Sequence, residues 1–133
     1  MMYITDNSRI LSREELSTPE EITNEIPLDK ESSKLIFGAR RSISQILHRQ
    51  DDRVIVVVGP CSIHDPKAAL EYAKLLKDFS SCVENELMVV MRVYFEKPRT
   101  TIGWKGLIND PHLDGSYDIN TGLRKARGLL RYL

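Results

Sequence analysis

The stretch that decides the fold of this chain reads RVIVVVGP and spans residues 53–60. Its five aliphatic residues, Val54–Val58, are all β-branched and do not alternate with polar residues. This pattern is typical of a strand that is buried on both faces, and such strands occur in parallel sheets covered by helices. Gly59 and Pro60 end the run. The stretch therefore predicts one strand of an α/β fold.

The residues that follow complete a strand–helix–strand–helix pattern. Asp65 and Pro66 are typical of a helix N-terminus, and apolar residues continue from there at helical spacing. A second apolar run, Leu87–Val93, predicts a buried strand parallel to the first. A final helix is expected over about residues 120–131.

Two polar segments follow the two predicted strands. They span residues 59–65 and 92–105, and the second opens a long loop that reaches residue 116. Long loops in compact domains are usually functional, and chemistry in α/β folds gathers at the carboxyl ends of the strands. We therefore expect these segments to form the functional site, with Trp104 anchoring the loop.

Residues 1–52 are expected to form an extension that precedes an α/β unit spanning 53–133. Thr18 and Pro19 predict the start of a short helix that Pro27 ends. A longer helix is expected over about 32–48, with one buried face. The apolar residues of that face are Leu35, Ile36, Ala39, Ile43, Ile46 and Leu47.

Composition excludes several classes of protein. The chain has 133 residues, with 19 basic and 19 acidic residues, so it has no overall positive field to gather nucleic acid. The apolar runs are far shorter than the roughly twenty residues of a membrane span. Two cysteines are too few for a disulfide scaffold and favour a cytoplasmic setting. The basic residues concentrate in 92–133, which hold eight basic and four acidic residues.

Cys61 follows Gly59 and Pro60, which come directly after the first predicted strand. A small packing residue is the ordinary interpretation of a lone cysteine in a turn. A metal ligand or nucleophile is the alternative, since a thiolate at a strand end faces the site. His64 lies three residues further on, and Cys61 with His64 would make at most half of a tetrahedral metal site.

Three cations lie within eight residues at the end of the second predicted strand: Arg92, which interrupts its apolar residues, Lys97 and Arg99. Thr100 and Thr101 add hydroxyls, and together these groups suit a phosphate or carboxylate. The alternative is a set of salt bridges to Glu96 and nearby acids. Neither a P-loop nor a dinucleotide-binding glycine motif follows either strand, which disfavours a nucleotide site.

These motifs closely resemble class I 3-deoxy-D-arabino-heptulosonate-7-phosphate (DAHP) synthase. The resemblance rests on GPCSIHDP at 59–66, MRVYFEKPRTT at 91–101 and GWKGLINDP at 103–111. It implies an N-terminal helical extension plus the first two βα units of a (β/α)8 TIM barrel, truncated in this chain. It also implies condensation of phosphoenolpyruvate with erythrose 4-phosphate to give DAHP and phosphate, the first step of the shikimate pathway.

The resemblance implies roles for six residues of the two segments. Cys61 would be a ligand of a divalent metal ion such as manganese, iron or zinc. Arg92 and Lys97 would contact phosphoenolpyruvate, with Lys97 near the reacting centre. The erythrose 4-phosphate site would contain Pro98, Arg99 and Thr100.

The resemblance further implies a homo-oligomer with feedback inhibition by an aromatic amino acid, in which the extension takes part. A full barrel needs about 250 residues, and the remaining metal ligands of the family lie on later strands. We therefore expect the 133-residue chain to be a fragment that is inactive and marginally stable alone. Two rivals stay open: a non-catalytic module that docks on a full-length synthase, and a different phosphosugar-binding protein.

Overall fold

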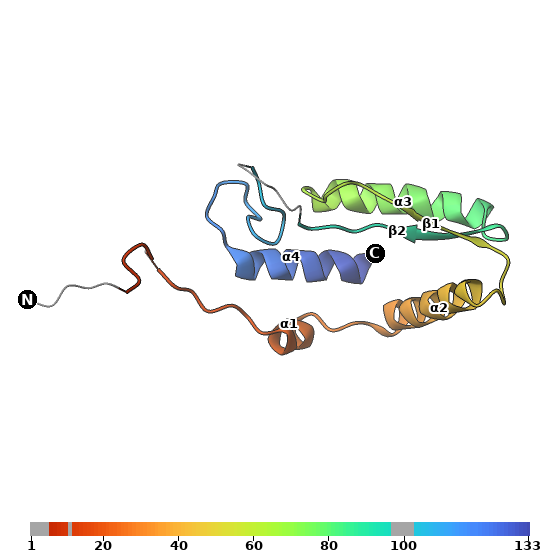
Figure 1. Ribbon diagram of the computed structural model, residues 1–133, viewed down its shortest axis with the longest axis horizontal. Coiled ribbons are helices and arrows are strands. Elements are labelled where there is room, and N and C mark those ends of the chain that lie inside the picture. The colour runs from red at the N-terminus through yellow and green to blue at the C-terminus, as the bar shows by residue number, and fades with distance from the viewer. Residues whose placement is uncertain (1–5, 11, 97–102) are drawn as a thin grey trace, which may run out of the picture.

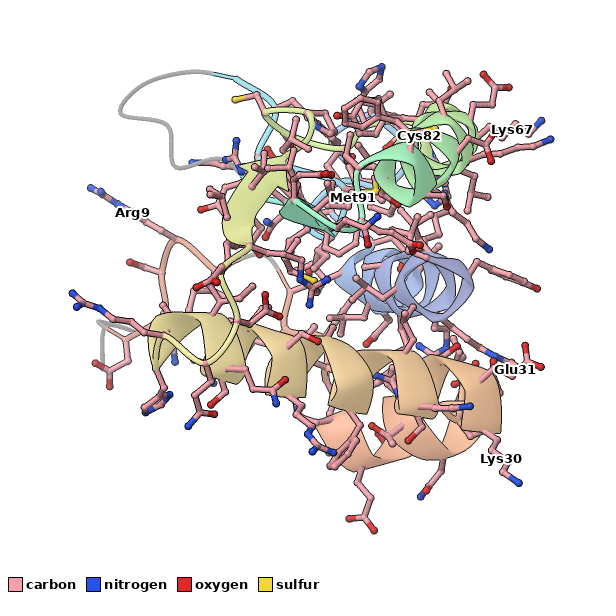
Figure 2. All side chains as sticks on the ribbon, turned by 90° about the vertical axis from the view of Figure 1, so that its right-hand side faces the viewer. Arg9, Lys30, Glu31, Lys67, Cys82 and Met91 are labelled. Atoms are coloured by element: carbon pink, nitrogen blue, oxygen red, sulfur yellow. The ribbon has the colours of Figure 1, made fainter. Side chains whose placement is uncertain are left out.

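The computed structural model describes residues 6–10, 12–96 and 103–133. The elements run in the order α1 (Pro19–Glu25), α2 (Lys30–Leu47), β1 (Val54–Val58), α3 (Pro66–Cys82), β2 (Leu87–Met91) and α4 (Ile119–Tyr132). Helix α4 lies between α3 on one side and the pair α1 and α2 on the other (Figures 1 and 2).

The helices begin at polar caps. Thr18 forms a capping box with Glu21, and Asp65 caps α3 with Pro66 at its first turn, both as predicted. Helix α2 begins two residues before its predicted start. The Asp29 carboxylate accepts a hydrogen bond from the Ser32 backbone N–H at 2.8 Å. This bond satisfies one of the first-turn N–H groups that have no partner within the helix.

The two strands pair in parallel, as predicted. The register runs from Val54 opposite Leu87 to Val58 opposite Met91. Strand β2 ends two residues before its predicted end, so Arg92 lies just beyond the strand.

The prediction that both strands are buried is not confirmed: the residues of β2 are half-buried, and β1 is in part exposed. Val54 is 60% exposed and Val57 is 63% exposed. In the part of the chain that the structure describes, the sheet has two strands, so β1 has a single neighbour and one open edge.

The predicted buried face of α2 is also not buried. Leu35 is 62% exposed and Leu47 is 71% exposed, while Ala39, Ile43 and Ile46 are half-buried. The helix contacts β1 and lies with α1 in the lower part of Figure 2. The helical periodicity is correct, whereas the predicted burial of this face is not.

The core lies directly beneath the carboxyl ends of the strands. Its buried members are Ile63, Ala69, Leu107 and Leu129, and partly buried side chains, Trp104 and Phe95 among them, pack against them. These residues come from the loop after β1, from α3, from the loop before α4 and from α4 itself. The core therefore supports the loops that carry the predicted site.

The extension docks on one face of α4. Four side chains at spacings of four, three and four residues form this face, which we call the α4 polar stripe: Asn120, Arg124, Arg127 and Arg131. The Asn120 amide oxygen accepts from the Ser17 backbone N–H at 2.7 Å, and Arg124 pairs with Glu25 at 2.8 Å. Arg127 and Arg131 contact the chain between Glu25 and Lys30. Beside the stripe, Ile22 of α1 is buried.

Candidate functional site

The segments after β1 and β2 run side by side, as predicted. The Arg92 backbone N–H donates to the Val58 carbonyl oxygen at 2.8 Å. One step further, the Ile63 backbone N–H donates to the Tyr94 carbonyl oxygen at 2.8 Å. We call residues 59–65 and 92–96 together the strand-end site.

Gly59 is required by this close approach. A Cβ atom at this position would lie 2.4 Å from the Arg92 carbonyl oxygen, closer than real Cβ contacts come. Any side chain would therefore push the two segments apart. The glycine that ends the first strand thus also sets the distance across the site.

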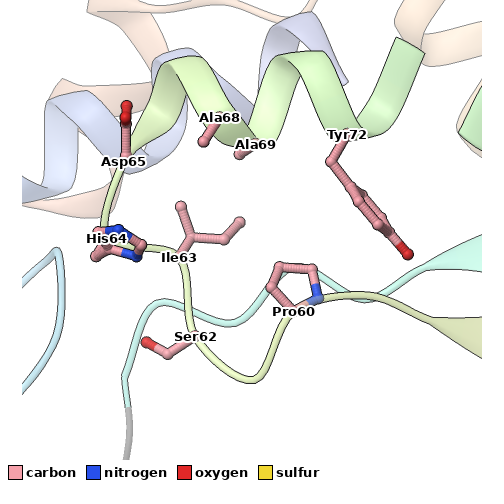
Figure 3. Close-up of a pocket in the computed structure, with 8 residues that line it drawn as sticks. All are labelled: Pro60, Ser62, Ile63, His64, Asp65, Ala68, Ala69 and Tyr72. Carbon is pink, nitrogen blue, oxygen red and sulfur yellow. The ribbon is translucent and has the colours of Figure 1, made fainter. Parts of the chain in front are cut away.

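Cys61 lies at the strand end where it was predicted, with its residue exposed. Ile63, only 2% exposed, anchors the same loop in the core and points toward Ala68 and Ala69 of α3, beside a cavity of about 210 Å³ (Figure 3). The second cysteine, Cys82, is the last residue of α3.

The donor chemistry at Cys61 fits one ligand of a divalent metal ion, because a cysteine sulfur is a common ligand of such ions. His64 is exposed three residues away. Among the described residues, no group of three or more His, Cys, Asp and Glu side chains gathers at one place. The metal-ligand role of Cys61 therefore stays a prediction, and further ligands would have to come from elsewhere.

Arg92 is the first residue beyond β2, and its guanidinium carbon lies 5.0 Å from the centre of the Tyr94 ring. Within the described ranges no carboxylate forms an ion pair with Arg92. The carboxylate of Glu96 instead accepts from the Asn109 side-chain amide at 3.3 Å. The described residues thus give no support to a salt bridge between Arg92 and Glu96.

Four predicted site residues, Lys97, Pro98, Arg99 and Thr100, lie outside the described residues, so their roles stay predictions. The segments before and after them contact each other. Glu96 and Gly106 form an antiparallel bridge, and the Leu107 backbone N–H donates to the Phe95 carbonyl oxygen at 2.9 Å.

The loop before α4 is held by a clasp that sequence reasoning did not identify. The Trp104 indole N–H donates to the Asp110 carbonyl oxygen at 2.8 Å, and the buried Asp110 carboxylate accepts from the Gly115 backbone N–H at 3.2 Å. Trp104 packs against the core, which confirms its predicted anchoring role. The Asp110-Pro111 pair followed by Gly115 is the turn signal that could have located the clasp.

The basic excess of residues 92–133 is not one patch. Three of its arginines, Arg124, Arg127 and Arg131, belong to the α4 polar stripe and contact the extension. At the N-terminus of α4, hydrogen bonds from Thr121 and then the contact with His112 hold the pKa of Asp118 below its ordinary value. This carboxylate caps the helix rather than serving the strand-end site.

The described helices include none that is both long and apolar enough to cross a bilayer. Fold and site together define an α/β protein with two parallel strands, in which the segments that carry Cys61 and Arg92 lie side by side beyond the strand ends. The chain belongs to the DAHP synthetase I family, whose family model matches residues 21–130.

Individual relatives agree with this family. The chain is 58% identical over 125 residues to the phospho-2-dehydro-3-deoxyheptonate aldolase of Amycolatopsis methanolica, covering 94% of this chain and 62% of that protein. It is 57% identical to the tyrosine-inhibited enzyme of Schizosaccharomyces pombe, covering 92% of this chain and 33% of that enzyme. It is 52% identical to the Phe-sensitive enzyme of Escherichia coli K12, with coverage of 98% and 37%.

A solved structure extends the comparison to three dimensions. The phospho-2-dehydro-3-deoxyheptonate aldolase of Francisella tularensis SCHU S4 superposes with a TM-score of 0.87 and 53% identity. The match covers 92% of this chain and 37% of that one. The chain thus spans between one third and two thirds of the length of these relatives.

Proposed function

We propose that this chain is the N-terminal part of a DAHP synthase, which condenses phosphoenolpyruvate with erythrose 4-phosphate to give DAHP and phosphate. The observation that carries the proposal is the meeting of two family motifs at one place. The hydrogen bonds from Arg92 to Val58 and from Ile63 to Tyr94 bring the Cys61 segment beside the Arg92 segment.

The residues of this chain would bind and orient the substrates. Arg92 offers a planar fork of N–H donors that suits the phosphate or carboxylate of phosphoenolpyruvate. Lys97 would hold the same substrate near the reacting carbon. Pro98, Arg99 and Thr100 would hold erythrose 4-phosphate, so that two anions that repel each other are fixed in a productive arrangement.

Cys61 would be one ligand of the divalent metal ion. When bound, such an ion supplies Lewis-acid polarisation of the aldehyde oxygen. The exposed thiol at the end of β1 supports this role. A soft thiolate is compatible with iron or zinc, while manganese would depend on harder oxygen ligands from elsewhere.

The fold proposed for the whole protein is a (β/α)8 barrel that begins with β1 and β2. The open edge of β1 supports it, as do the exposed apolar residues on α3, Leu75 at 71% and Phe79 at 54%. These are the surfaces on which further βα units would pack.

The extension before residue 53 would contribute to oligomer contacts and to feedback by an aromatic amino acid in the cytoplasm. The tyrosine- and phenylalanine-sensitive relatives support the feedback.

A chimaeric enzyme tests the proposal. Residues 1–133 are joined to the part of the E. coli Phe-sensitive enzyme that follows its matched segment. We expect phosphate release from phosphoenolpyruvate that depends on erythrose 4-phosphate. Arg92→Gln should reduce this rate by about 100- to 1,000-fold, the effect of removing one donor to a developing charge.

Arg41→Gln on the exposed surface of α2 is the matched control and should leave the rate unchanged. A folded chimaera without phosphate release, or equal rates for the Arg92 and Arg41 variants, would contradict the proposal. If the 133-residue chain instead alters the size or activity of an intact synthase without supplying a working site, the non-catalytic docking module is favoured.

A further inference from the structure

Tyr94 contacts both segments of the strand-end site. Its ring lies under the Arg92 guanidinium, with 5.0 Å between the guanidinium carbon and the ring centre. Its backbone carbonyl oxygen accepts from Ile63 at 2.8 Å and so holds the loop that carries Cys61. One residue therefore links the positions of the guanidinium and the thiol.

Arg92 needs such a support. Its residue is exposed, and within the described part of the chain no carboxylate pairs with it. A long side chain of this kind populates many rotamers, and ordering it when an anion binds costs affinity. An aromatic face attracts the guanidinium face and leaves its in-plane N–H donors available. Stacking on Tyr94 therefore restricts Arg92 without occupying the groups that would bind an anion.

We propose that Tyr94 is a positioning residue: its ring preorganises Arg92 for phosphoenolpyruvate while its carbonyl oxygen fixes the Cys61 segment. This inference rests on the proposed function. The ring carries the effect, not the hydroxyl, because Tyr94 is 41% exposed and its hydroxyl has no hydrogen-bond partner among the described residues.

Kinetics of the chimaera test the positioning role. Tyr94→Leu should raise the KM for phosphoenolpyruvate about two- to fivefold, the range of an exposed cation–π contact. The KM for erythrose 4-phosphate and kcat should change little. Tyr94→Phe keeps the aromatic face and should restore the KM. Tyr132→Leu, which changes a tyrosine that is 79% exposed at the far end of α4, is the control.

A fluorinated side chain separates electrostatics from shape. 3,4,5-Trifluorophenylalanine at position 94 keeps the packing of phenylalanine but weakens the negative ring face. We expect it to raise the KM for phosphoenolpyruvate toward the Leu value. In an Arg92→Gln background, the difference between Tyr94 and Leu should disappear, because the partner of the ring is gone.

An NMR measurement on the chain itself does not depend on activity. The side-chain signals of Arg92 should carry a ring-current shift that Tyr94→Leu abolishes and Tyr94→Phe retains. The positioning role is overturned if neither Tyr94→Leu nor the fluorinated ring changes the KM for phosphoenolpyruvate. It is also overturned if the Arg92 signals carry no ring-current shift. A wild-type chimaera without synthase activity instead contradicts the proposed function, and the ring-current shift still decides whether Tyr94 holds Arg92.

Discussion

Gly59 and Arg92 approach so closely that a Cβ atom on Gly59 would lie 2.4 Å from the Arg92 carbonyl oxygen. This contact brings the ends of β1 and β2 together at the strand-end site. The adjoining hydrogen bond from Arg92 to Val58 depends on it. The Cys61 segment and the Arg92 segment can therefore lie this close only because Gly59 has no side chain.

Gly59→Ala is expected to destabilise the chain by about 1–3 kcal/mol, because the backbone must move to admit the methyl group. Urea unfolding followed by circular dichroism measures the free energy of unfolding. Gly38→Ala is the matched control, since nothing lies within 4 Å of the added carbon and the position is in the middle of α2. That change should stabilise by up to about 1 kcal/mol. Equal effects at the two positions would contradict the close approach.

Replacement of Cys61 should remove the metal-dependent activity of the chimaera. Cys61→Ala is expected to lower kcat/KM by about 100-fold or more, since changes even to groups that only support a metal ligand cost about 10- to 100-fold. Cys82→Ala, at the other exposed cysteine, should have no effect. A chelator should abolish the activity of the unsubstituted chimaera, and added manganese, iron or zinc should restore it. Retained activity in Cys61→Ala would show that the metal is held without this thiol.

Arg124 joins the extension to α4 through Glu25 and Ser17. Arg124→Ala should therefore loosen the extension and speed its removal by a protease, observed by mass spectrometry. Because the side chains of both partners are partly exposed to solvent, the effect should grow weaker as salt is added. Arg40→Ala, on the exposed surface of α2, is the control. Equal cleavage rates for the Arg124 and Arg40 variants would mean that the stripe does not hold the extension.

Acid should weaken the caps of α2 and α4. The pKa values of Asp29 and Asp118 are held below their ordinary value of 3.8, first by hydrogen bonds from Ser32 and Thr121. A carboxylate whose pKa is lower in the folded state stabilises the fold above its unfolded pKa, and this stability is lost as pH falls through the folded pKa. Unfolding free energies should thus decline below about pH 4.

Asn is also a good N-cap but does not titrate. The double variant Asp29→Asn and Asp118→Asn should therefore flatten this decline, and thermal unfolding between pH 2 and pH 6 measures it. If the free energy of unfolding of the double variant declines in acid as steeply as before, other carboxylates cause the decline.

The sequence predicted the elements better than their burial. The β-branched run Val54–Val58 is a local signal for a strand, and caps such as Thr18 act within one turn. Burial depends on neighbours distant in sequence, so Val57 and Leu47 are exposed although their patterns are those of core residues. The role of Tyr94 was missed, but its signal was present: residues two apart in an extended segment share a side, which places Tyr94 beneath Arg92.

The clasp at Asp110 offers a direct spectroscopic test, because Trp104 is the single tryptophan of the chain. Asp110→Ala leaves the Gly115 backbone N–H without its carboxylate acceptor, which should cost about 1–3 kcal/mol of stability. The loop should then loosen, and the Trp104 emission should shift to longer wavelength as water reaches the indole. Asp114→Ala is the matched control, since Asp114 is exposed and its carboxylate accepts from the neighbouring Ser116 backbone N–H. Equal emission spectra for the two variants would show that the Asp110 carboxylate does not help to keep Trp104 against the core.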